Sequence, residues 1–356
     1  AKSLATDEQT IQLSITVYIL GLAIGQLVYG PIADALGRRP AVLGGLAIYV
    51  VGSIGCFLAP NVPLLLTARL VQALGGAGGL ALTRVIVADN NKGVAATRGL
   101  AVLNLVMLIG PGLAPIVGAE IAELFGWRAN LLFLSVMGVG AMVLAAWLLP
   151  ETGTPTGSFR IGQIASNIAA LARVRDFRRS VIGGATGSTA CYAYFVSAPF
   201  ILHSSMGLSI QAVGYAVGAT LGAAALGNLA TRSIVGRVSD RAIQLSFAAL
   251  GAAAGGLFLV LAIGDWLTPV STIGLSCVIL FAAGALNPVT VGAALSDAGT
   301  RVGAASGIFG SFQMVTGVVC TFIAGLFSDH ALGTGIILLG AYLVCWSQFY
   351  LRGRTG

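Results

Sequence analysis

The sequence predicts an all-α membrane protein that crosses a lipid bilayer many times. Apolar residues make up 57% and charged residues 9% of the 356 residues, against roughly 45–50% and 25% in soluble globular proteins. The apolar residues fall in runs of about 20, the length that a helix needs to cross a hydrocarbon core of about 30 Å. The 50 glycines suit helices that pack backbone against backbone in lipid.

Eleven apolar runs of this length lie along the chain, separated by charged or turn-forming residues. The connectors between them are short, except for residues 150–180. We therefore predict membrane-spanning helices over 11–33, 41–59, 63–86, 99–121, 129–149, 181–202, 211–230, 242–263, 269–290, 303–327 and 331–351.

The basic residues predict the orientation of these helices. With the turn at Arg38 and Arg39 in the cytoplasm, Lys2 and Arg128 fall outside and Arg69 lies within a run. By the positive-inside rule this indicates a bacterial inner membrane protein with a cytoplasmic C-terminus. The net charge of +7 is scattered through short loops, so we expect no nucleic-acid partner. Sixteen of the nineteen lysines and arginines then face the cytoplasm: Arg38, Arg39, Arg84, Lys92, Arg98, Arg160, Arg173, Arg175, Arg178, Arg179, Arg232, Arg237, Arg241, Arg301, Arg352 and Arg354.

Five runs precede the long basic connector and six follow it. The chain starts on the outer side with AKSLATDEQT and lacks an initiator methionine, so we expect one N-terminal helix to be missing. A native eleven-span protein is the alternative. A G-x-x-A pattern before a basic turn, at Gly30 and again at Gly227, suggests two equivalent halves. The predicted domains are an N-terminal bundle with five of six helices (1–152), a cytoplasmic connector (153–180) and a C-terminal six-helix bundle (181–356).

The stretch from Gly30 to Arg39, GPIADALGRR, resembles the signature loop of the major facilitator superfamily, G-x-x-x-D-[RK]-x-G-[RK]-[RK], and departs from it at Ala35. The resemblance implies two six-helix bundles, related by an axis along the membrane normal, that rock about a central site. Several motifs resemble its drug-export branch named for bicyclomycin and chloramphenicol resistance (Bcr/CflA): YILGLAIGQLVYGPIADALGRRP, RLVQALG from Arg69, Arg84 with Asp89, APIVG from Ala114, GWR from Gly126 and LPET from Leu149.

The signature loop is a candidate gate. Asp34 is placed to pair with Arg38 or Arg39, and the family pattern implies that it also docks against the positive N-terminus of a helix from the other half. Such contacts would hold the inner side shut in the outward-facing state. The alternative is a solvated surface ion pair worth about 0–1 kcal/mol. The predicted gating residues are Gly30, Asp34, Gly37, Arg38, Arg39 and Asp89.

Arg69 is the one arginine that the predicted runs place well inside the membrane, and Gln72 follows it one turn later. A charge at such depth costs roughly 2.5–3.5 kcal/mol on insertion scales, which favours a role in proton coupling. Relatives commonly carry an acid on the first helix. We therefore expect the partner of Arg69 and the proton-carrying carboxylate to lie outside this sequence. The alternative is that Arg69 extends to the outer interface.

The fourth run contains glycines and prolines that should bend it. It resembles the antiporter motif of exporters, in which a kinked helix packs tightly against the other bundle and limits proton leakage. The alternative is that membrane helices simply tolerate these prolines. The predicted residues of this antiporter-type helix are Gly110, Pro111, Pro115 and Gly118.

Polar and aromatic residues within the runs are candidates for the substrate cavity, although each is alternatively a helix–helix contact. A cavity of this composition lacks acids and suits lipophilic neutral or zwitterionic compounds better than polycations. The candidates are Tyr18, Gln26, Asn104, Met107, Tyr192, Tyr194, Phe195, Asn287 and Gln313.

Enzyme chemistry is not expected. The five cysteines and two histidines show no metal-ligand spacing, and the glycines of 75–79 lack the lysine of a phosphate-binding loop. We predict no catalytic residue, metal or cofactor. The leading hypothesis is a monomeric transporter in the bilayer that exports drug-like or metabolite molecules in exchange for protons and so confers antibiotic resistance. A proton-coupled uptake symporter on the same fold is the alternative, and a membrane enzyme or channel is less consistent with the sequence.

Overall fold

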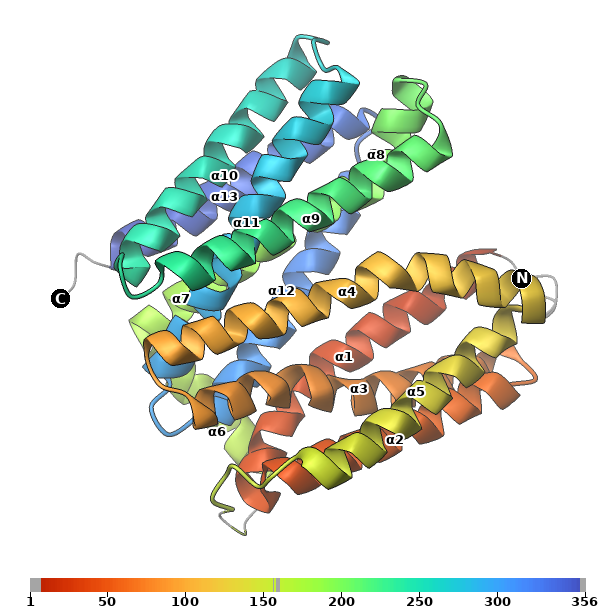
Figure 1. Cartoon of the computed structure of the whole chain (residues 1–356), viewed down its shortest axis with the longest axis vertical. Coiled ribbons are helices and arrows are strands. Elements are labelled where there is room, and N and C mark those ends of the chain that lie inside the picture. Colours follow the sequence, from red (N-terminus) through yellow and green to blue (C-terminus); the bar gives the residue numbers. More distant parts are fainter. Residues whose placement is uncertain (1–7, 156, 158–160, 353–356) are drawn as a thin grey trace. The chain divides into compact units, whose positions relative to one another are not determined.

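The computed structural model describes residues 8–155, 157 and 161–352, and this part of the chain is helical apart from its connecting loops and one isolated bridge between Val235 and Val238. The segments, in chain order (Figure 1), are α1 (Glu8–Leu36), α2 (Arg38–Leu58), α3 (Val62–Asn90), α4 (Val94–Phe125), α5 (Trp127–Leu148), α6 (Ile161–Arg173), α7 (Arg175–Thr189), α8 (Cys191–Ala198), the π-helix η2 (Pro199–Ser205), α9 (Ile210–Ile234), α10 (Asp240–Ile263), α11 (Pro269–Asp297), α12 (Val302–Gly325) and α13 (His330–Arg352).

Nine helices of the described part are long and apolar enough to cross a membrane, and they coincide with nine of the eleven predicted runs. The predicted run 99–121 lies within α4. The predicted run 181–202 differs from expectation, because the chain forms α7, α8 and η2 in succession instead of one helix. A turn at Ala190 separates α7 from α8, and Pro199 opens the π-helix. Proline has no N–H to donate, so it disrupts the regular hydrogen-bond ladder at that point.

The helices form two compact units that do not follow the chain in two consecutive pieces. The first unit takes the described residues of Ala1–Asn90, Leu113–Ala170 and Gly299–Ser311. The second takes the described residues of Asn91–Gly112, Leu171–Ala298 and Phe312–Gly356. Hence α4 and α12 each contribute one part to each unit. The domain boundaries that the sequence suggests stay a prediction.

The two units use the same packing scheme. In the first unit α3 packs against α1 and α2, and α5 packs against α2. In the second unit α11 packs against α9 and α10, and α13 packs against α10. This correspondence agrees with the repeat of the G-x-x-A pattern in α1 and α9. The helix α7 also packs against α11 and α13. By the repeat, an equivalent helix of the first half would pack against α3 and α5; that it precedes residue 1 stays a prediction.

Glycines let α9 and α11 approach closely. A Cβ built on Gly227 would overlap the Phe281 carbonyl oxygen, and one built on Gly284 would overlap the Ala224 carbonyl oxygen. Thr231 adds a hydrogen bond from its hydroxyl to the Ala285 carbonyl, at 2.8 Å. Small residues at such crossings allow the backbone-to-backbone packing that holds helices together in lipid.

We predict that Gly284→Ala lowers the thermal unfolding midpoint, because its methyl group can fit only if the two helices separate. Overpacking of this kind costs about 1–3 kcal/mol. The matched control is Gly274→Ala in the same helix, where a Cβ has nothing within 4 Å. Unfolding of the detergent-purified variants is measured by tryptophan fluorescence. Equal midpoints for the two variants would contradict the close approach of α9 and α11.

Candidate functional site

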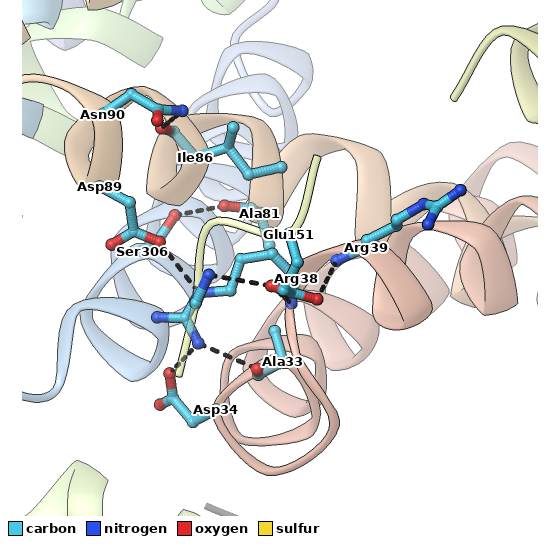
Figure 2. A network of polar contacts seen from close by, with 11 residues as sticks. Ala33, Asp34, Arg38, Arg39, Ala81, Ile86, Asp89, Asn90, Glu151 and Ser306 are labelled. Carbon is cyan, nitrogen blue, oxygen red and sulfur yellow. Dashed lines mark hydrogen bonds and ion pairs between the residues drawn. The ribbon is translucent and has the colours of Figure 1, made fainter. Parts of the chain in front are cut away.

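Arg38 joins the ends of three helices in the first unit. Its Nη1 donates to Asp34 Oδ1 at 2.8 Å and to the Ala33 carbonyl at 2.9 Å, and its Nε donates to Asp89 Oδ2 at 3.0 Å. Figure 2 shows these side chains converging from α1, α2 and the end of α3. The Arg38 side chain is only 10% exposed. Ion pairing therefore takes place largely out of water, unlike the solvated surface pair considered as the alternative.

Glu151, in the loop after α5, caps the start of α2. Gly37 turns the chain between α1 and α2 with φ of 101° and offers no side chain as a cap. The Glu151 carboxylate instead accepts the backbone N–H groups of Arg38 at 2.8 Å and Arg39 at 3.2 Å, and that of Gly153 at 2.9 Å. A negative charge is favourable at a helix N-terminus. The φ of Gly37 favours glycine, and a Cβ at this position would also overlap the Glu151 carboxylate and displace it from its place as a cap.

The pKa of Glu151 lies below the usual range of glutamate. Desolvation by itself acts in the opposite direction and raises the pKa, but hydrogen bonds from the backbone N–H groups of Gly153, Arg38, Arg39 and Thr152 together outweigh it. These donors stabilise the charged form. Sequence analysis did not single out Glu151 as part of the site, although the motif LPET marked its position.

The side chain of Arg39 makes a different contact from that of Arg38. Its Nη2 donates to the Ala146 carbonyl at 2.6 Å and so connects the start of α2 to the end of α5. The two pairings that the sequence left open for Asp34 are thus resolved in favour of Arg38. The roles of Arg38 and Arg39 are different: one bridges carboxylates, and the other completes the last turn of a neighbouring helix.

The beginning of α12 packs against α1 and α3 within the first unit. A Cβ on Gly30 would overlap the Gly303 carbonyl, and a Cβ on Gly303 would lie 3.0 Å and 3.1 Å from the two carboxylate oxygens of Asp34. Ser306 donates its hydroxyl to the Ala81 carbonyl at 2.7 Å (Figure 2). Because α12 begins at Val302, the Asp34 carboxylate lies beside the first turn of this helix, where its charge is favourable.

Arg69 lies in a polar chain of the same unit. Its Nη1 donates to Gln72 Oε1 at 2.9 Å, and Gln72 Nε2 donates to Ser53 Oγ at 2.8 Å. The Arg69 guanidinium also lies 5.6 Å from the centre of the Tyr18 ring. Gln72 and Ser53 are fully buried, so the Gln72 side-chain amide, which accepts the hydrogen bond from Arg69, is held in position. Among the described residues, no carboxylate lies within ion-pair distance of Arg69.

Arg84 corrects two expectations. The sequence placed it at the cytoplasmic face because the predicted run ended at residue 86, but α3 continues to Asn90 and leaves Arg84 inside the helix, 5% exposed. Its guanidinium lies 5.8 Å from the centre of the Phe309 ring. Gln26, which is 1% exposed, lies next to it, and both side chains contact Gly310. Arg69 is therefore not the one arginine well inside α3, because Arg84 lies within the same helix.

The other predicted cavity residues belong to the second unit. Gln313 Nε2 donates to Ser188 Oγ at 2.9 Å. Tyr192 is 39% exposed and lies against Gly317, whereas Tyr194 is fully buried in a core cluster with Ala198. Successive residues of one helix point in different directions, so the run of aromatic residues does not line one surface. In this conformation Tyr194 supports the core. Asn104 and Met107 lie on α4, Asn287 on α11, and Phe195 packs between Tyr192 and Tyr194.

The predicted antiporter-type segment lies in α4, which continues without interruption from Val94 to Phe125. Gly110 is exposed, and the Gly118 carbonyl accepts a hydrogen bond from Asn130 Nδ2 at 3.0 Å. The side chains of Pro111 and Pro115 lie outside the described part. The predicted bend of this helix stays a prediction.

Within the described residues there is no group of three or more side chains suited to hold a metal ion.

Three features define a multi-pass membrane transporter. The helices are long and apolar, the two units have the same packing scheme, and helices of the first unit hold buried arginines. Residues 1–321 match the family model described as Major Facilitator Superfamily, and the chain belongs to this superfamily. The protein is therefore a membrane transporter that acts on small-molecule substrates within the lipid bilayer. Transporters of this superfamily are in general not enzymes.

Relatives and a solved structure extend this assignment. The chain is 27% identical over 363 residues to Multidrug resistance protein D of Escherichia coli (strain K12), covering 99% of this chain and 89% of the relative. It is 32% identical over 213 residues to a chloramphenicol resistance protein of Pseudomonas aeruginosa, covering 58% of this chain and 49% of the relative. A crystal structure of the E. coli fucose:proton symporter FucP shows the same fold, with a TM-score of 0.75, 16% identity, and coverage of 98% of this chain and 92% of the symporter.

We predict that the double variant Asp34→Asn with Asp89→Asn is less stable than the triple variant that also carries Arg38→Met. Removing both carboxylates leaves a buried guanidinium without its counter-charges, and breaking a buried pair costs about 3–5 kcal/mol, less where the acids are partly exposed. Unfolding midpoints in detergent provide the measurement. The control is Asp265→Asn, an exposed loop residue with φ of 52° that asparagine tolerates. A triple variant no more stable than the double would argue against the charge balance at Arg38.

A second prediction concerns pH. The folded-state pKa of Glu151 is lowered, so its carboxylate adds stability at pH values above the usual glutamate pKa of about 4.3, and this stability is lost as pH falls through the lowered value. The difference in unfolding midpoint between wild type and Glu151→Gln should therefore be present at neutral pH and disappear in acid. Glu123→Gln, an exposed change in α4, serves as control. A difference that is independent of pH would refute the charged cap.

Proposed function

We propose that this protein exports drug-like or metabolite molecules from the cytoplasm in exchange for protons, by alternating access. The observation that carries this proposal is the docking of the first turns of α12 on α1 and α3, beside Asp34 and the Arg38 cluster. Gly30, Gly303 and Ser306 make this contact through backbone and small groups. An interface of this kind can close and open as a unit, which is what a gate requires.

Asp34 takes part in two electrostatic interactions, and only one of them involves α12. Its pair with Arg38 is formed across the short connection between α1 and α2, whereas it faces the N-terminus of α12 only while α12 is docked. Withdrawal of α12 would remove the helix dipole from the carboxylate. We therefore propose that the residues Gly30, Asp34, Gly37, Arg38 and Asp89 form the cytoplasmic gate, with Glu151 fixing the start of α2.

Arg69 is the proposed element of proton coupling. It is a half-buried cation within α3, held by Gln72, and its guanidinium lies 5.6 Å from the centre of the Tyr18 ring. A carboxylate that exchanges its proton beside Arg69 would change the net charge of this region in each transport cycle. Each proton entering the cell releases about 2.3 kcal/mol per 100 mV of membrane potential, and about 1.36 kcal/mol per pH unit.

Export, rather than uptake, is proposed from the names of relatives. Proteins similar over nearly the whole chain are called multidrug resistance proteins, and resistance follows from removal of a drug from the cell. We further propose a Bcr/CflA-type transporter in a bacterial inner membrane, with its C-terminus in the cytoplasm, acting as a monomer. We also propose that Gly110, Pro111, Pro115 and Gly118 of α4 form the antiporter-type segment that limits proton leakage.

The test uses the full gene in everted membrane vesicles that carry an established proton gradient. Adding chloramphenicol should dissipate part of the gradient in vesicles with the wild-type protein, and Arg69→Ala should reduce this effect at least tenfold. Arg173→Ala, an exposed change at the end of α6, is the matched control and should leave it unchanged.

The outcome that opposes export is equally specific. If chloramphenicol and a panel of further compounds leave the gradient unaffected, or if Arg69→Ala transports as well as wild type, proton-coupled antiport through Arg69 is wrong. Compound-dependent proton movement in the same direction as the compound would indicate a symporter.

A further inference from the structure

We infer that Arg84 and Gln26 form a subsite that binds the carboxylate of an anionic organic molecule, and that α12 covers this subsite in the present conformation. The inference rests on the proposed transport function and adds a class of substrate to it. It depends on a cation, an amide and a glycine that three different helices bring to one place in the first unit. Arg84 comes from α3, Gln26 from α1 and Gly310 from α12.

The three residues are in contact. A Cβ built on Gly310 would overlap Gln26 Oε1 and would lie 3.0 Å from Arg84 Nη1. The Arg84 guanidinium also lies 5.8 Å from the centre of the ring of Phe309, the residue before Gly310. Gln26 is 1% exposed and Arg84 is 5% exposed. The start of α12 thus covers both polar groups with a backbone segment that carries no side chain at the point of contact.

The chemistry of this cluster selects an anion. An arginine side chain carries five N–H donors in a planar fork that matches the two oxygens of a carboxylate, and it stays charged at every physiological pH. The Gln26 Nε2 group has no hydrogen-bond partner among the described residues. A buried donor without an acceptor is unfavourable, and a carboxylate oxygen would satisfy it. A cationic ligand would be repelled by Arg84.

Access to the subsite depends on the gate. Arg84 precedes Asp89 by five residues of α3, which is about 8 Å along the helix axis, so the subsite lies just inside the Arg38 cluster. Ser306 holds α12 against the Ala81 carbonyl, one turn from the covering Gly310. If this part of α12 withdrew, Arg84 would become accessible from the end of the first unit where the Arg38 cluster lies. An anion bound there would in turn oppose the return of α12.

The test measures binding without transport. The full-length protein in neutral detergent is titrated with tritiated salicylate, and salicylamide, which has the same ring and no carboxylate, is used as competitor. We expect saturable binding of salicylate that salicylamide does not displace. Binding should fall at least tenfold in Arg84→Gln and severalfold in Arg84→Lys, which keeps the charge but not the fork. The control Arg128→Gln changes an arginine at the start of α5 and should bind as wild type does.

A second variant protects the test against misfolding of Arg84→Gln. Gln26→Glu places a carboxylate of the protein beside Arg84, so it should abolish salicylate binding while the protein remains as stable as wild type. Absence of saturable binding by wild type, binding that survives Arg84→Gln or Gln26→Glu, or equal competition by salicylamide would each overturn the inference. Chloramphenicol-dependent proton movement, measured in everted vesicles that carry the same variants, separates the two proposals, because its persistence would leave the export function standing without the anion subsite.

Discussion

The end of the first unit that we propose as the gate depends on the interactions of the Arg38 guanidinium. It pairs with the carboxylates of Asp34 and Asp89 and donates a further hydrogen bond to the Ala33 carbonyl, and so ties together the ends of α1, α2 and α3. A cation that is largely excluded from water must keep such partners. These contacts join the ends of the three helices, and they hold the Asp34 carboxylate beside the first turn of α12.

Much of this arrangement was predictable from the sequence, and the exceptions have physical causes. Long apolar runs and the signature loop indicated the helices and the pairing of Asp34, because both are local patterns. Glu151 was missed as a cap because it is 113 residues from Arg38, and only the fold brings them together. Arg84 was placed at the cytoplasmic face because the predicted run ended at residue 86, four residues before α3 ends. The break at Ala190 and Pro199 was missed because an apolar run does not reveal how its hydrogen bonds are arranged.

Two arginines lie at different depths of α3, each in a region for which we propose a function. Arg69 and Arg84 are 15 residues apart, or about 22 Å along the helix, and each is held by a neighbouring amide or aromatic ring rather than exposed at a membrane surface. Each lies within a bundle whose other buried groups are mostly apolar, so each charge is costly and sensitive to what covers it. The region of Arg69, proposed for proton coupling, and the region of Arg84, next to the proposed gate, are therefore connected through a single helix.

The gate that we propose requires the contact between α12 and α1 to form and separate in every transport cycle. Gly30, Gly303 and Gly307 place backbone against backbone in this contact, and Gly310 lies against the Gln26 side chain. In contrast, Tyr342 in the core of the second unit buries a large side chain. Because burial energy grows with apolar area, a contact made by glycines contributes less burial energy per residue than one made by large side chains. The glycine contact therefore suits the separation that the proposed gate requires.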